Sequence, residues 1–191
     1  DDEISIVPII HGGSTTRIQF SITHSDIEIF DVLNDKKFHK EFLDELRSKY
    51  KQLIIQTINP QFLLNARHAK KILTLSLHAK KNKTLLSKKI EIDILLRFAG
   101  TTQISRAIRI AGKKAQFKNY FIIAIGRKST LERLHLYLRH YPTNPFKTKQ
   151  FSKNNHQYLK KQFKVSKIHL SAVSSKDSLE NIIVEKAAVL I

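Results

Sequence analysis

Residues 66–81 contain neither glycine nor proline, and they follow Asn65, a residue type that often caps the start of a helix. Small and apolar side chains recur in this stretch at helical spacing, at positions 69, 72, 73, 76 and 79. The pattern predicts a helix over 66–81 with one face packed in a core. On the opposite side, the spacing predicts a basic stripe that favours phosphate binding. It is formed by Arg67, Lys71, Thr74, His78 and Lys81.

Two further helices are predicted on either side of Gly100. Over 90–98 both strand-like and helix-like spacings fit, and we favour a helix because Leu95 and Leu96 break the alternation and Gly100 suits a helix C-terminus. A second helix is predicted over 104–111. Its expected apolar face is formed by Ile104, Ala107, Ile108 and Ala111.

The corner between these helices, residues 100–103, is a candidate anion site. Thr101 or Thr102 is expected to cap the second helix, where backbone N–H groups are free and the helix dipole favours a negative charge. An ordinary helical corner without a ligand is the alternative.

The 191-residue chain has 34 Lys and Arg against 16 Asp and Glu, a formal net charge of +18, and the excess lies in its middle. Residues 61–128 hold 16 basic and 2 acidic side chains, and residues 129–176 hold 10 and 1. The two ends, 1–60 and 177–191, are each slightly acidic. This excess favours a polyanionic partner, most simply nucleic acid, over a lysine-rich surface that is only solvated.

The remaining segments predict a small mixed β-sheet covered by helices, which is an α+β fold in a single compact domain over 1–191. Apolar, β-prone runs predict four strands, at 4–10, 17–22, 53–55 and 120–125. The pair Gly12-Gly13 suits a hairpin turn between the first two, because glycine tolerates positive φ.

Three more helices are predicted from helical periodicity, at 35–50, 131–140 and 178–191. Ser129 is the expected N-cap of the second. The last ends on apolar residues, so it packs in the core or meets a partner protein. Residues 141–156 carry two prolines with several Lys and Asn, and we expect a mobile basic loop.

Composition excludes several classes of protein. There is no cysteine, which excludes disulfide scaffolds, thiolate zinc sites and cysteine nucleophiles. The longest apolar runs reach only about six residues where a membrane-spanning helix needs roughly 20. The start has no apolar signal segment, so we expect a cytoplasmic protein that does not enter a membrane. Because the chain starts at Asp1 and not at Met, we expect that its natural N-terminus is missing or altered.

No catalytic or metal-binding constellation is recognisable. The basic middle contains three acids, Glu91, Asp93 and Glu132, which are not clustered as the cations of a metal-dependent nuclease require. The nine histidines show no ligand spacing beyond chance. A nuclease that uses His68 or His78 is an alternative, but we favour a binding protein with no catalytic residue, no metal and no cofactor.

Several of these segments together resemble a known family. Asn65-x-x-His68-Ala69 opens a helix, the block 94–108 contains Leu-Leu-x-x-x-Gly-x-x-Gln-Ile, and Gly112 and an apolar strand at 121–126 follow. With the ending Glu-Lys-Ala-Ala-Val-Leu at 185–190, this order is similar to the TPRKB-type (Cgi) subunit of the KEOPS (EKC) complex. The resemblance covers roughly 50–126 and 178–191.

The resemblance implies a non-enzymatic subunit with two partners and no small-molecule substrate. Members of the family bind the small kinase/ATPase of KEOPS, and through it the rest of the complex. They also capture the 3′ CCA end of tRNA for threonylcarbamoyl modification of adenosine 37. A generic basic RNA- or ribosome-binding domain without a KEOPS partner is the alternative.

The basic helix and the corner are where we expect the RNA. The candidate tRNA-binding residues are Asn65, Arg67, His68, Lys70, Lys71, His78, Arg97, Gly100, Thr101, Thr102, Gln103, Ile104, Arg106, Lys113 and Lys114. The apolar C-terminal helix is the expected contact of the kinase subunit, through Ile182, Ile183, Lys186, Val189 and Leu190.

Overall fold

The computed structural model describes residues 5–7, 17–33, 42–112, 119–140 and 153–190. The chain divides into two compact units. One, here called the sheet unit, comprises 1–60 and 112–148, and the other, the helical unit, comprises 61–111 and 149–191. The helical unit is therefore made of two separate stretches of chain. The prediction of one domain over 1–191 stays a prediction.

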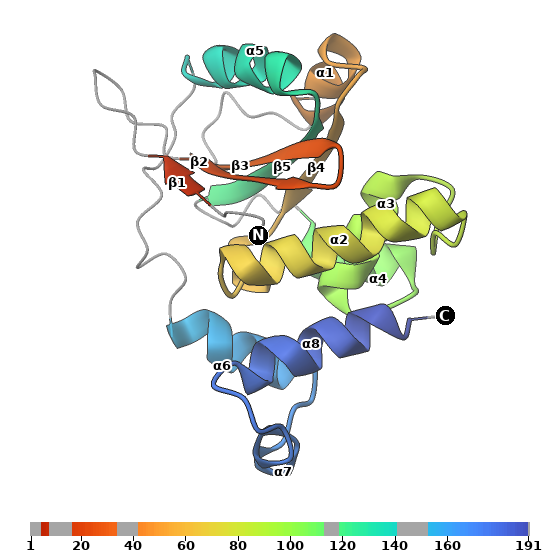
Figure 1. Cartoon of the computed structure of the whole chain (residues 1–191), viewed down its shortest axis with the longest axis vertical. Helices are drawn as coiled ribbons and strands as arrows, with labels where there is room; N and C mark the ends of the chain where they lie inside the picture. Colours follow the sequence, from red (N-terminus) through yellow and green to blue (C-terminus); the bar gives the residue numbers. More distant parts are fainter. Residues whose placement is uncertain (1–4, 8–16, 34–41, 113–118, 141–152, 191) are drawn as a thin grey trace. The chain divides into compact units, whose positions relative to one another are not determined.

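The sheet unit is built on a five-stranded sheet in the order β1-β2-β3-β5-β4 (Figure 1). Its strands are β1 (Ser5–Val7), β2 (Arg17–Ile22), β3 (Ser25–Leu33), β4 (Ile54–Ile58) and β5 (Asn119–Gly126). Every neighbouring pair is antiparallel, where we had expected a mixed sheet. β3 and β4 do run in the same direction, but β5 lies between them and antiparallel to both, so no parallel pair forms.

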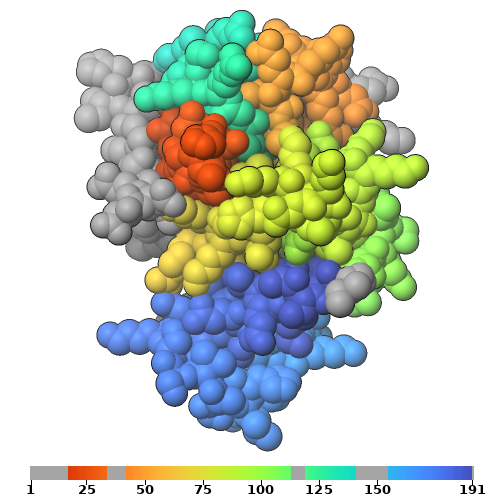
Figure 2. Space-filling view, turned by 45° about the vertical axis from the view of Figure 1, so that its right-hand side comes forward, coloured from red at the N-terminus to blue at the C-terminus, as the bar shows by residue number. Residues whose placement is uncertain are grey.

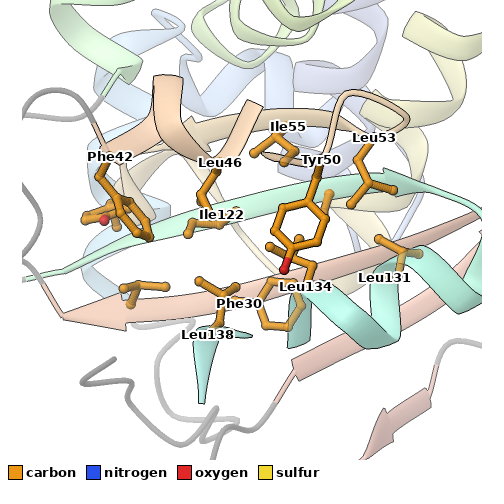
Figure 3. Close-up of a cluster of buried hydrophobic side chains, with 13 residues drawn as sticks. Phe30, Phe42, Leu46, Tyr50, Leu53, Ile55, Ile122, Leu131, Leu134 and Leu138 are labelled. Carbon is orange, nitrogen blue, oxygen red and sulfur yellow. The ribbon is translucent and has the colours of Figure 1, made fainter. Parts of the chain in front are cut away.

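Two helices, α1 (Phe42–Lys49) and α5 (Lys128–Leu138), pack on one face of this sheet. Figure 3 shows their side chains meeting strand residues such as Phe30, Ile55 and Ile122 in one apolar cluster. Side chains at alternate strand positions share a face, so the period of two places Phe30 and Ile122 toward the helices. Tyr50 joins the cluster and donates its hydroxyl to the backbone carbonyl of Arg133 at 3.2 Å.

The helical unit contains α2 (Ala66–Asn82), α3 (Ile90–Ala99), α4 (Ile104–Ala111), α6 (Lys153–Gln162), α7 (Lys167–Ser171) and α8 (Ser178–Ala188), with a short 3-10 turn at Pro60–Phe62 before α2. In Figure 1, α8 runs alongside α2, and α6 and α7 lie beyond it. All five positions predicted to face inward on α2, from Ala69 to Ala79, are buried. No helix in the described ranges combines the length and apolarity that a membrane span requires.

The α+β class and most elements are confirmed, with local differences. β3, α6 and α7 were not predicted, and α6 begins inside the segment that we expected to be a loop. Helix α5 begins one turn earlier than predicted, so its N-cap is Arg127 and not Ser129. The Gly12-Gly13 turn, residues 34–41 and residues 141–152 lie outside the described residues.

Candidate RNA and partner interface

Asn65 starts helix α2 and also links it to α8. Its Oδ1 accepts the backbone N–H of His68 at 2.7 Å, as predicted for an N-cap. Its Nδ2 donates to Oε2 of Glu180 on α8 at 2.9 Å. The cap therefore both begins the helix and holds a buried carboxylate.

Two basic residues of α2 reach the same carboxylate. Arg67 Nε lies 3.0 Å and Lys71 Nζ lies 2.8 Å from Glu180 Oε1, and Arg67 Nη2 lies 2.6 Å from Asp177 Oδ2. The Glu180 side chain is only 3% exposed. These residues, Asn65, Arg67, Lys71, Asp177 and Glu180, are called the α2–α8 seam below.

The seam corrects the prediction that the stripe on α2 is an open basic face. Burial alone would raise the pKa of Glu180, but the hydrogen bonds from Lys71, Asn65 and Arg67 hold its pKa below the usual value. Arg67 and Lys71 thus face acids of α8 because α8 docks along this side of α2. Their charge balances buried acid and is not available in full to a phosphate.

His68 is a core residue. It is 0% exposed, packs edge-on against the Phe98 ring at 5.8 Å, and its Nδ1 lies 3.4 Å from the Leu64 N–H. Burial lowers its pKa to about 4, so the imidazole is neutral at pH 7. A neutral, enclosed ring cannot contact an RNA phosphate, and we leave His68 out of the RNA surface.

Arg97 is also internal. It is 5% exposed, its Nε lies 2.9 Å from Oδ2 of Asp93 one turn earlier, and its Nη1 donates to the Ala187 carbonyl at 2.8 Å. The guanidinium thus joins α3 to the last turn of α8, where a cation suits the helix C-terminus. We had expected Arg97 to meet phosphate, and the structure gives this cation an internal partner.

The corner of residues 100–103 is ordered by its glycine. Gly100 ends α3 in the left-handed region, with φ of 63°, and a Cβ there would overlap the ring of Phe163, the residue that follows α6. Thr101 is buried, and its Oγ1 accepts the N–H of Gln103 at 3.3 Å. The corner therefore packs closely against Phe163, just past the end of α6.

The side chains that follow the corner are turned outward. The five residues from Thr102 to Arg106 are all exposed, and Arg109 is exposed as well. Ala107 and Ala111 are buried as predicted, but Ile104 and Ile108, expected on the same apolar face, are 45% and 52% exposed. α4 therefore presents two apolar side chains together with two arginines.

A second surface lies between α7 and α8. His169, Ala172, Val173, Ile182, Glu185, Lys186 and Val189 line a groove of about 290 Å³, here called the α7–α8 groove. Val189 is 65% exposed and Lys186 is exposed, while Ile182 is 7% exposed at its floor. Ile183 is fully buried and packs in the core, so of the predicted kinase contacts it is the one turned away from any partner.

Comparison with known families identifies the chain. A profile described as "kinase binding protein CGI-121" matches residues 29–190. The chain belongs to the CGI-121 family. The match spans β3 to α8, and so includes the seam, the corner and the α7–α8 groove. No curated protein matches the sequence closely enough to add a relative.

The description of the CGI-121 family is one of kinase binding, and the described residues contain no assembled metal site. No three His, Asp or Glu side chains in the described ranges gather into a group that could hold a metal ion.

Of the other predicted RNA contacts, His78 is exposed and Lys70 is half-buried. Lys113 and Lys114 lie outside the described residues.

Two features of this CGI-121 chain were missed from the sequence. Glu180 was not singled out, although it lies in the first turn of the last helix and pairs with residues more than 100 positions away. The lysines at the end of α6 were assigned no role, although residues 153–176 contain six lysines and no acid. That imbalance is the signal that could have found them.

Proposed function

We propose that this protein is a non-catalytic accessory subunit of the KEOPS complex. It binds the kinase/ATPase subunit and recruits tRNA by its 3′ CCA end for modification of adenosine 37, in the cytoplasm. Membership of a kinase-binding family supports the first partner. The resemblance of the Leu-Leu-x-x-x-Gly-x-x-Gln-Ile block supports the second.

The corner of residues 100–103 is the observation that carries the RNA part. A single-stranded end needs a place where backbone donors meet a phosphate and where an unstacked base finds an apolar surface. At this corner the start of α4 offers N–H groups, Thr102 and Gln103 are exposed, and Ile104 is a half-exposed apolar side chain beside Arg106. These groups are of the types that one RNA end requires.

The charge of the helical unit supports the same partner. Its described residues hold 18 Lys and Arg against 5 Asp and Glu. Asp93, Asp177 and Glu180 are already paired with internal cations. The remaining excess is large enough to raise the local concentration of an RNA and its rate of association.

Binding of tRNA with and without its CCA end tests the RNA part. We expect salt-sensitive binding of intact tRNA that weakens at least tenfold when the CCA end is trimmed. Arg106→Glu should remove most of that difference, and Arg139→Glu, an exposed arginine of the sheet unit, should leave it unchanged. Equal affinity for intact and trimmed tRNA would instead support the generic RNA-binding alternative.

The α7–α8 groove is the proposed kinase contact. It combines an apolar floor at Ile182 with an exposed apolar rim at Val189, and Lys186 and Glu185 add charges of both signs. An apolar centre with a polar rim is typical of specific protein interfaces. The groove can therefore give both affinity and orientation.

Capture of purified KEOPS kinase subunit tests this contact. We expect wild-type protein to retain the kinase and Val189→Asp to reduce capture at least tenfold. Leu136→Asp is a matched control, because Leu136 is a 55% exposed apolar residue on α5 of the sheet unit. Undiminished capture by Val189→Asp would place the contact elsewhere, and no capture by the wild type would remove the KEOPS assignment.

A further inference from the structure

The end of α6 carries a group of lysines around a hollow. Gln157, Lys160, Lys161, Lys164, Val165 and Ser166 line a volume of about 440 Å³. Gln157, Lys160 and Lys161 are spaced three and one residues apart, which places them along one side of α6, and Lys164 follows just past its end. Lys160, Lys161 and Lys164 are called the lysine patch below.

The lysine patch has no acid to balance it. No ion pair in the described part of the chain involves any of its three members. Residues 153–176, which include the patch, hold six lysines and no Asp or Glu. Figure 2 shows long side chains that project from the surface of the segment that contains α6 to α8, coloured blue. Like charges this close repel each other, so the patch costs stability unless an anion offsets it.

Helix electrostatics explain only part of this arrangement. Lys160 and Lys161 lie in the last turn of α6, where a cation interacts favourably with the helix dipole. Lys164 lies past the last helical residue, with φ of 51°, a conformation that glycine adopts more readily than lysine. A third cation held there in a left-handed conformation is therefore not accounted for by the dipole.

We propose that the lysine patch binds the phosphate backbone of RNA at a place separate from the RNA end. The patch lines the hollow at the end of α6, whereas the neighbouring Phe163 is 7% exposed and packs against Gly100 of the corner. None of the residues that line the hollow belongs to the corner. The inference rests on the proposed function for the choice of RNA as the polyanion, and it adds a contact that does not depend on the CCA end.

Lysine is suited to this role because its ammonium is a point charge without base specificity. Phosphate contacts of this kind position a nucleic acid and make its binding depend on salt. Gln157 and Ser166 add neutral donors to the same hollow. Val165, also in the lining, is 4% exposed, so the lysines, Gln157 and Ser166 are the residues that an external ligand would meet.

Binding of tRNA that lacks its CCA end tests the patch apart from the corner. The variant K160Q/K161Q/K164Q should bind the trimmed tRNA at least tenfold more weakly than the wild type at low salt. The slope of log affinity against log salt should decrease by about 2 to 3, because each lost phosphate contact changes it by about 0.9. The CCA-dependent difference should persist, since the corner is intact.

The matched control is R127Q/K128Q/R133Q, which removes the same charge from exposed positions of the sheet unit. Circular dichroism of both triple variants checks that the fold is kept. An equal loss in both would mean that only total charge matters, and this would overturn the proposal. Loss of binding to vesicles of anionic lipid by the patch variant, with RNA affinity kept, would also overturn it.

The two proposals fail in different ways. If wild-type protein binds intact and trimmed tRNA equally but the patch variant binds both weakly, end recognition is wrong and the patch stands. If trimming matters but the patch variant binds like the wild type, the patch is wrong and the corner stands.

Discussion

The α2–α8 seam and the lysine patch belong to the same unit, and both are rich in basic side chains, but they use them in opposite ways. In the seam, Arg67 and Lys71 surround the buried Glu180 at hydrogen-bonding distances. In the lysine patch, no cation has an acidic partner in the described residues, and the side chains surround a hollow. A count of lysines and arginines does not distinguish these cases.

The two regions differ in whether acidic side chains lie next to the basic ones. α8 brings Asp177 and Glu180 against α2, so cations there stabilise the packing of two helices. No acid occurs in residues 153–176, so cations on α6 remain for an external anion. Charge that is balanced within the fold contributes to stability, and charge that is not balanced is a candidate for binding.

Removal of Arg97 should have the largest effect on stability, because Arg97 is a buried cation of the helical unit and is paired with a buried acid. Arg97→Ala leaves Asp93, which is 0% exposed, without its cation, and we expect a loss of about 3–5 kcal/mol in the free energy of unfolding. Urea unfolding measures it. Arg109→Ala, at an exposed position, should change it by less than about 0.5 kcal/mol. Similar losses for the two variants would break the distinction between inward and outward cations.

His68, a buried residue of α2, makes the free energy of unfolding depend on pH. Its pKa is about 4 in the folded chain because of burial, against 6.5 for the ordinary group, so between these values the unfolded chain binds a proton that the folded chain does not. The free energy of unfolding should therefore fall as pH decreases from about 6.5 to about 4, by on the order of 3 kcal/mol from this group.

Urea unfolding at pH 7 and pH 4.5 checks this dependence. His68→Gln should show a smaller loss between the two pH values than the wild type, and His78→Gln, at an exposed position, should match the wild type. His135, whose pKa burial also lowers to about 4, leaves a remaining dependence of the same sign. An unchanged loss in His68→Gln would contradict a neutral, enclosed ring.

Gly100→Ala tests how tightly the corner of residues 100–103 is held against Phe163. Alanine at φ of 63° is strained, and its Cβ would overlap the Phe163 ring, so we expect a loss of about 2–3 kcal/mol. Lys83→Gly is the opposite change, since Lys83 has φ of 59° at the end of α2, and it should stabilise by about 0.5–1 kcal/mol. Thermal unfolding of both variants measures these effects, and a neutral Gly100→Ala would mean that the corner can move away from Phe163.

Glu180→Gln should have the smallest effect on stability and would make the seam more like the patch. The amide keeps the shape but removes the charge that holds Arg67 and Lys71, so we expect a loss of about 1–2 kcal/mol at pH 7. Because the pKa of Glu180 is lowered in the fold, this contribution to stability is present above about pH 4.5 and is lost as pH falls. The free energies of unfolding of the wild type and of Glu180→Gln should therefore become equal in acid. Affinity for tRNA should increase, since two cations lose their internal partner; a decrease would mean that seam geometry itself binds RNA.

Local patterns predicted the elements whose signals lie within a few residues. Asn65 as a cap, the inward positions of α2 and Gly100 as the end of α3 all follow from short-range spacing and backbone conformation. β3 was missed although Ile27 and Ile29 alternate with Asp and Glu, because such acids are typical of solvated connections.

Long-range pairing could not be predicted in the same way. The seam depends on Glu180 meeting residues more than 100 positions earlier, and nothing near Arg67 in the sequence indicates an acidic partner. The burial of His68 and Arg97 likewise depends on the docking of neighbouring helices. The sequence therefore located the basic region and its family but did not separate internal cations from outward ones.

The position of β5 between β3 and β4 has a consequence for biosynthesis. β3 pairs with β5 from Asp26↔Gly126 to Leu33↔Asn119, so β3 leaves the ribosome long before its partner strand exists. During that interval its edge is open, and an open edge of a β-strand is a site of aggregation. Asp26, Glu28 and Asp31 place charge along this strand, and their repulsion discourages pairing with a second nascent chain until β5 arrives.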